Sequence, residues 1–134
     1  MISPAAERRL LQAAIAIGGL VPVSAGLLGV LAGAQMIPNE AVGGISLDSH
    51  VRYLSGILLA IGLGFWSAIP QIERRTARVR VLAFLVVIGG LARLYGLTAG
   101  VPSLPMQLAL GMELVVTPLL CLWQARIARH HRAE

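Results

Sequence analysis

The chain has 134 residues, of which 57% are hydrophobic and only 13% are charged, and its formal net charge is +5. A soluble protein of this length needs more polar surface to cover its core, so the composition favours a membrane protein. Nucleic-acid binding explains the basic balance poorly, because the arginines flank long apolar runs and do not line one polar face.

Four apolar runs follow one another along the chain. A bilayer core about 30 Å thick needs roughly 20 apolar residues in each helix that crosses it. The sequence therefore predicts an all-α fold, a four-helix transmembrane bundle that forms one integral membrane domain over residues 1–134. The helices are expected at about residues 10–34, 51–69, 81–97 and 106–123.

The first run also resembles a secretory signal. Arg8 and Arg9 precede it, and Ala32-Gly33-Ala34 at its end has the A-x-A pattern of a cleavage site. Its apolar stretch, however, is much longer than the roughly 7–15 residues of a signal core. We therefore expect a retained helix.

The positions of the arginines predict how the helices are oriented. Nine of them lie before the first run, between the second and third runs, or after the fourth, whereas the connections at 35–49 and 98–103 contain no Arg or Lys. The nine are Arg8, Arg9, Arg74, Arg75, Arg78, Arg80, Arg126, Arg129 and Arg132. The positive-inside rule then places both termini in the cytoplasm. All eleven basic residues are Arg, which with abundant Ala and Gly is typical of a GC-rich bacterial genome, so we expect a multi-pass protein of the bacterial inner membrane.

Three charged residues fall inside the apolar runs, where charges are costly and mark function by default. Arg52, Arg93 and Glu113 come from three different helices and lie at a similar depth in the outer half of the bilayer. A lone arginine at the centre of a helix costs about 2.5–3.5 kcal/mol on an insertion scale. We therefore expect the three side chains to form one polar cluster.

Two interpretations of this cluster stay open. It forms a ligand pocket if the positive charge of two arginines beside one carboxylate is compensated by a bound molecule. It is only structural if the arginines extend to the interface or pair with Glu113 to fix helix register, with Asp48 absorbing the excess charge. The expected ligand-binding residues are Arg52, Arg93, Glu113, His50, Asp48, Tyr53 and Gln107.

Small residues accompany the charged ones and predict helix contacts. Gly56, Ala60 and Gly64 continue the face of Arg52 at a spacing of four, which lets helix backbones approach closely. Gly89 and Gly96 are expected to flank Arg93 on a similar face.

No cofactor or metal site is expected. Cys121 is the only cysteine, so the chain has no internal disulfide and no thiolate metal cluster. His130 and His131 stand in a basic tail that is more typical of a solvated or lipid-facing segment than of a metal site. The sequence contains no H-E-x-x-H, P-loop or G-x-S-x-G motif.

Four short motifs follow in a fixed order: H-x-R at 50–52, G-G-x-x-R at 89–93, G-x-P at 100–102 and E-L at 113–114. With them, nearly the whole chain resembles a bacterial domain-of-unknown-function family (number four-three-four-five) of short four-helix membrane proteins. The resemblance implies a four-helix membrane fold and no established activity. More loosely, the chain is similar to the DoxX-type group, a likeness of fold that transfers no function.

Three functions are compatible with these observations. A binding or accessory protein, surrounded by membrane lipids, would hold a small amphipathic or anionic ligand, such as a lipid or a quinone-like molecule. A small membrane enzyme of isomerase type would use Glu113 or His50 as the base, with the arginines stabilising negative charge. A transporter or pore subunit of this size would need to form a homo-oligomer.

Overall fold

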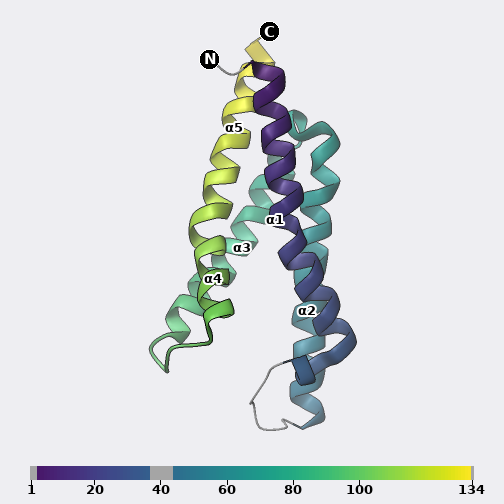
Figure 1. Ribbon diagram of the computed structural model, residues 1–134, viewed down its shortest axis with the longest axis vertical. Helices are drawn as coiled ribbons and strands as arrows, with labels where there is room; N and C mark the ends of the chain where they lie inside the picture. Colours follow the sequence, from purple (N-terminus) through teal and green to yellow (C-terminus); the bar gives the residue numbers. More distant parts are fainter. Residues whose placement is uncertain (1–2, 37–43, 134) are drawn as a thin grey trace. The chain divides into compact units, whose positions relative to one another are not determined.

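The computed structural model describes residues 3–36 and 44–133, with only the backbone at 132 and 133. The described residues form helices and no strand (Figure 1). In chain order the elements are α1 (Pro4–Ala32), the 3-10 helix η1 (Gly33–Met36), α2 (Ile45–Ala68), the 3-10 helix η2 (Ile69–Arg74), α3 (Thr76–Gly96), α4 (Leu104–Gly111), the π-helical turn η3 (Met112–Val116) and α5 (Thr117–Ala133).

Four helical stretches in the described part of the chain are long and apolar enough to cross a membrane, by length and composition. Each overlaps one of the four predicted runs and begins before it: Pro4–Met36, Ile45–Arg74, Thr76–Gly96 and Leu104–His131. The all-α fold with four such helices is therefore confirmed. The first helix begins before its apolar run because Ser3 caps it, accepting a hydrogen bond on Oγ from the Ala6 N–H at 3.3 Å.

The chain divides into two compact units. The first unit comprises Met1–Ala14 and Ala68–Glu134, and so contains the first turns of α1 together with η2, α3, α4, η3 and α5. The second unit comprises Ile15–Ser67, which is the rest of α1 with η1 and α2.

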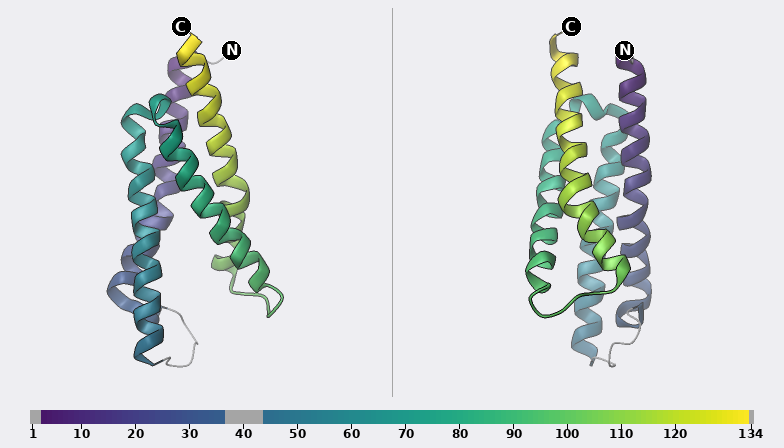
Figure 2. Two further views of the ribbon diagram at one scale, coloured as in Figure 1. Left: turned by 180° about the vertical axis from the view of Figure 1, so that it is seen from behind. Right: turned by 60° about the vertical axis from the view of Figure 1, so that its left-hand side comes forward.

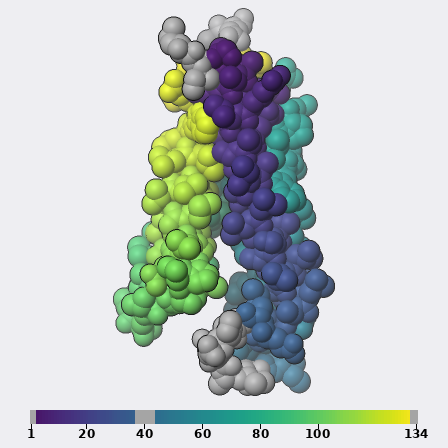
Figure 3. All heavy atoms as spheres, viewed as in Figure 1, coloured from purple at the N-terminus to yellow at the C-terminus, as the bar shows by residue number. Residues whose placement is uncertain are grey.

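The core of the first unit lies where its N-terminal segment meets η2 and the last turns of α5. Leu11, Ile72 and Gln124 are fully buried there, and Val79 of α3 is almost so. The first turns of α1 and the last turns of α5 lie side by side (Figure 3), and the Trp123 indole donates a hydrogen bond to Glu7 between them. The observed packing therefore brings these two segments to one end of the first unit.

Side-chain donors hold the irregular η2 segment in this core. Because Gln71 is not helical, carbonyls of η2 lack the partners of a regular helix. Gln12 Nε2 donates to the Ile69 carbonyl at 2.7 Å, and Gln124 Nε2 donates to the Ile72 carbonyl at 2.6 Å. Side chains of α1 and α5 thus both donate hydrogen bonds to the turn between α2 and α3.

The second unit is a close-packed pair of helices, α1 and α2 (Figure 2). A Cβ atom built on Gly26 would be 2.6 Å from the backbone nitrogen of Leu59, so only glycine fits this crossing. The expected stripe makes no such close approach: a Cβ atom built on Gly56 would be at an ordinary contact distance, 3.9 Å from Val30 Cγ2, and Ala60 is exposed. Small residues line this contact, but not at the predicted positions, and they come from both helices: a Cβ atom on Gly62 of α2 would be 2.7 Å from Val23 Cγ2 of α1.

Candidate functional site

Arg93 of α3 and Glu113 of η3 form a two-pronged ion pair in the first unit. Arg93 Nε donates to Glu113 Oε2 at 3.1 Å, and Nη2 donates to Oε1 at 3.2 Å. This parallel geometry is the strong form of an arginine–carboxylate contact. The side chains are 36% and 19% exposed, so the structure brings two of the predicted site residues together at a partly buried position.

A glycine permits the close approach of the two elements that carry this pair. A Cβ atom on Gly90, which is buried, would be 2.9 Å from the Cβ of Glu113 and 2.8 Å from Leu114 Cδ2. Gly89 and Gly96 have open space at the same position, with nothing within 4 Å. The prediction that Gly89 and Gly96 share the contact face of Arg93 is therefore wrong. It is Gly90 that lies against η3.

Glu113 lies in a widened helical turn. The Thr117 N–H donates to the Met112 carbonyl, five residues back, and the Thr117 hydroxyl donates to the same oxygen at 3.0 Å. Pro118 follows directly, and it has no N–H to donate and a ring that crowds the carbonyl four residues before it. Turns of this kind inside long helices are frequent at functional sites.

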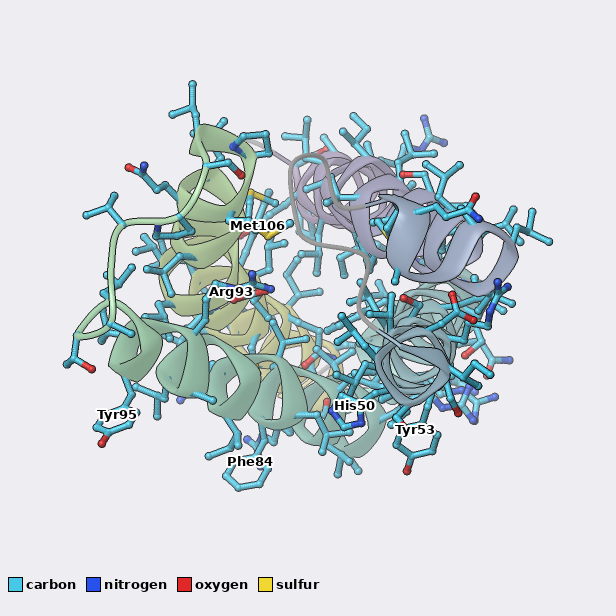
Figure 4. The ribbon with its side chains drawn as sticks, turned by 90° about the horizontal axis from the view of Figure 1, so that it is seen from below. His50, Tyr53, Phe84, Arg93, Tyr95 and Met106 are labelled. Carbon is cyan, nitrogen blue, oxygen red and sulfur yellow. The ribbon has the colours of Figure 1, made fainter. Side chains whose placement is uncertain are left out.

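The guanidinium of Arg93 has donors to spare. Its Nη1 donates to Met106 Sδ at 3.0 Å, and Figure 4 shows the two side chains pointing toward each other. A guanidinium carries five N–H groups, and a thioether is only a weak acceptor. Three of the five are used by Glu113 and Met106, so two have no acceptor among the residues described.

Arg52 has different partners, all in the second unit. Its Nε donates to Asp48 Oδ2 at 2.7 Å, and its Nη1 donates to the carbonyls of Val30 and Leu31 at 2.7 and 3.0 Å. These carbonyls belong to the last turn of α1, where helix geometry leaves them without partners and the helix dipole favours a cation. Arg52 therefore caps the C-terminus of α1.

Asp48 completes the cap. Its Oδ1 accepts the Ala34 N–H at 3.0 Å, just after Gly33 turns the chain with φ +61. A Cβ on Gly33 would collide with Asp48 Oδ1 and would be 2.8 Å from Arg52 Nη2. Because Asp48 compensates Arg52 and Glu113 compensates Arg93, the surplus positive charge expected from the sequence is absent from these two pairs.

The remaining predicted site residues take no part in either pair. His50 is exposed, Tyr53 is 66% exposed, and both rings point outward from α2 (Figure 4). Gln107 Nε2 donates to the Pro102 carbonyl at 2.9 Å and so fixes the turn before α4. The single cluster of Arg52, Arg93 and Glu113, which would join the two units, stays a prediction.

A second set of charges was not predicted as a site. Glu73 pairs with Arg8 at 3.2 Å, and Glu7 lies 3.8 Å from Arg126. The indole N–H of Trp123 donates to Glu7 Oε1 at 3.0 Å. In the sequence these arginines indicate only the orientation of the helices. The two carboxylates in otherwise basic segments were the signal that could have revealed the pairing.

Comparison with known proteins places this pattern in a family. The family model described as a domain of unknown function (DUF4345) matches residues 10–124, which include both ion pairs Arg93–Glu113 and Asp48–Arg52. Neither a curated protein nor a solved structure matches the chain. Within the described residues, no group of three or more His, Cys, Asp or Glu side chains is arranged to hold a metal ion.

Proposed function

The chain belongs to this domain-of-unknown-function family (DUF4345), and we propose that it is a membrane protein that binds the polar group of a small amphipathic molecule at Arg93. Its four long apolar helices support insertion in a membrane. The arginine distribution supports a bacterial inner-membrane location with both termini in the cytoplasm.

The observation that carries the binding proposal is the incompletely used guanidinium of Arg93. An N–H group in apolar surroundings without an acceptor is unfavourable. A ligand oxygen, whether carbonyl, carboxylate or phosphate, would accept both spare N–H groups while Glu113 holds the guanidinium plane fixed. The unbranched and polarizable side chain of Met106 adapts to an apolar tail beside it. A lipid or a quinone-like molecule has this combination of groups.

Binding accounts for the pair better than acid–base catalysis does. Each carboxylate oxygen of Glu113 accepts a hydrogen bond from Arg93, which fixes both oxygens and leaves each only one further lone pair for a proton. The pair therefore suits a fixed docking point more than a proton acceptor.

The proposal is tested by identifying small molecules that stay bound through purification in a mild detergent. The informative variant is Arg93→Gln/Glu113→Gln, because replacing both partners leaves no unpaired buried charge. The matched control is Arg52→Gln/Asp48→Asn, which makes the same chemical change at the α1 cap. Mass spectrometry should find an amphipathic molecule in the wild type and the control but not in the first variant. Equal retention by all three proteins would contradict the proposal.

A further inference from the structure

A second polar site lies at the end of the first unit where its termini meet. A cavity of about 570 Å³ opens between the first turns of α1, η2 and the last turns of α5. Its charged and titratable lining residues are Glu7, Arg8, Glu73, Arg126, His130 and His131. All of them lie just outside the predicted apolar runs, at the level where the headgroups of a bilayer begin.

The negative part of the lining is short of hydrogen-bond donors. Glu73 is about nine-tenths buried, and its Oε2 lies 3.2 Å from Arg8 Nε. That oxygen nevertheless accepts no hydrogen bond from the described residues, because the contact has the distance of an ion pair without the angle of a hydrogen bond. A buried carboxylate is stabilised by N–H donors. A ligand ammonium in the cavity would bring such donors to the Glu73 carboxyl group.

The positive part of the lining is short of acceptors. Arg126 is 65% exposed, and its nearest carboxylate, Glu7, is 3.8 Å away, which is beyond hydrogen-bond distance. Glu7 is already engaged by the Trp123 indole. His130 lies one helical turn after Arg126 and on the same face of α5. Side by side, a guanidinium and an imidazole are suited to bind a phosphate group.

We propose that this cavity binds the headgroup of a phospholipid that carries both a phosphate and a primary ammonium. The phosphate lies against Arg126 and His130, and the ammonium lies against Glu73. With neutral histidines, the two arginines and two glutamates of the lining balance, so the cavity offers a purely anionic headgroup no net attraction. A trimethylated ammonium has no N–H to give to Glu73, so the site selects the primary amine.

This inference rests on membrane insertion, but not on ligand binding at Arg93. Native mass spectrometry of the full chain would compare phosphatidylethanolamine, phosphatidylcholine and phosphatidylglycerol with identical acyl chains. The wild type should retain the ethanolamine lipid about tenfold better than either of the others, the effect of one charge-assisted hydrogen bond. Equal retention of the three lipids by the wild type overturns the proposal, whatever the variants do.

Two variants then test which residue binds the ammonium and which binds the phosphate. Glu73→Gln should abolish the preference for the primary amine, and Arg126→Gln should weaken retention of the ethanolamine lipid. The matched control is Arg129→Gln, which removes an exposed arginine of the same helix outside the cavity and should change nothing. An effect of Arg129→Gln equal to that of Arg126→Gln contradicts the assignment. Soluble phosphoethanolamine should compete only weakly, and binding as tight as that of the lipid would contradict a lipid occupant.

The variant Arg93→Gln/Glu113→Gln separates this proposal from the proposed function. It should lose the molecule bound at Arg93 and keep the wild-type lipid preference at the cavity. Loss of both would show that the cavity is not an independent site.

Discussion

Gly90 of α3 lies directly against Glu113, and a Cβ atom at Gly90 would be 2.9 Å from the Cβ of Glu113. Real Cβ atoms do not approach so closely, so any side chain at this position must push α3 away from the widened turn of η3. The Arg93–Glu113 pair stands one helical turn further along the same contact. The glycine and the ion pair are therefore parts of one structural feature.

The first prediction concerns this glycine and its neighbour. Gly90→Ala should destabilise the protein by about 1–3 kcal/mol, the usual cost of overpacking. Gly89→Ala is the control, because open space surrounds its Cβ position and alanine favours a helix by roughly 0.5–1 kcal/mol over glycine. Chemical unfolding in detergent, followed by circular dichroism, measures both. Equal stabilities of the two variants would be inconsistent with the packing described.

The two adjacent glycines also show what the sequence could and could not predict. Hydropathy located the four helices, because an apolar run of membrane-crossing length is visible without any knowledge of packing. It did not show which of Gly89 and Gly90 meets the partner helix. Neighbouring positions differ by about 100° around a helix, and the widened turn that decides the partner's orientation depends on hydrogen bonds several residues apart.

The candidate site was predictable to a similar extent. The cost of charge in hydrocarbon singled out Arg93 and Glu113, and they pair. The same argument selected Arg52, which instead caps α1. That role depends on the residue at which α1 ends, and a hydropathy pattern locates a helix end only to within several residues. The Glu73–Arg8 ion pair joins segments far apart in the chain. The number and positions of charges along the sequence do not show which distant charges come together.

A second prediction concerns the contact of α1 with α2. Gly26→Ala should destabilise the protein, because the added methyl group would be 2.6 Å from the backbone nitrogen of Leu59, which cannot move like a side chain. Gly18→Ala, on the same helix with nothing within 4 Å, serves as the control and should be neutral or slightly stabilising. Thermal unfolding of the purified proteins compares them. A lower melting temperature for Gly18→Ala than for Gly26→Ala would refute this close packing.

A third prediction concerns the cap on α1. Arg52→Lys keeps the charge but loses the planar fork that reaches Asp48 and two carbonyls at once. The melting temperature should fall by a few degrees, and the Ala34 amide, held by Asp48, should exchange its hydrogen faster. Tyr53→Phe is the control, since this side chain is 66% exposed. Unchanged hydrogen exchange at Ala34 in the Arg52 variant would argue against the cap.

The fourth prediction concerns orientation. In a Cys121→Ala background, an impermeant thiol reagent added outside intact cells should label Ser103→Cys and leave Ala77→Cys unlabelled. Both positions are exposed, so burial does not protect either cysteine from the reagent. The reason for the expected difference is the positive-inside rule, which predicts that the arginine-rich turn beside Ala77 lies in the cytoplasm. The reverse labelling pattern would rule out the proposed topology.

The most direct test of binding at Arg93 is to return the extracted ligand to the purified protein. The molecule that solvent releases from the wild type but not from Arg93→Gln/Glu113→Gln would be added back to both delipidated proteins, and both would be unfolded by heat. At about 100 times the dissociation constant, a ligand that binds only the folded state adds roughly 2.7 kcal/mol of stability. The wild type should therefore melt several degrees higher with this molecule, while the variant melts at the same temperature with and without it. An equal rise in both proteins, or none in the wild type, would contradict the assignment of Arg93 as the binding residue.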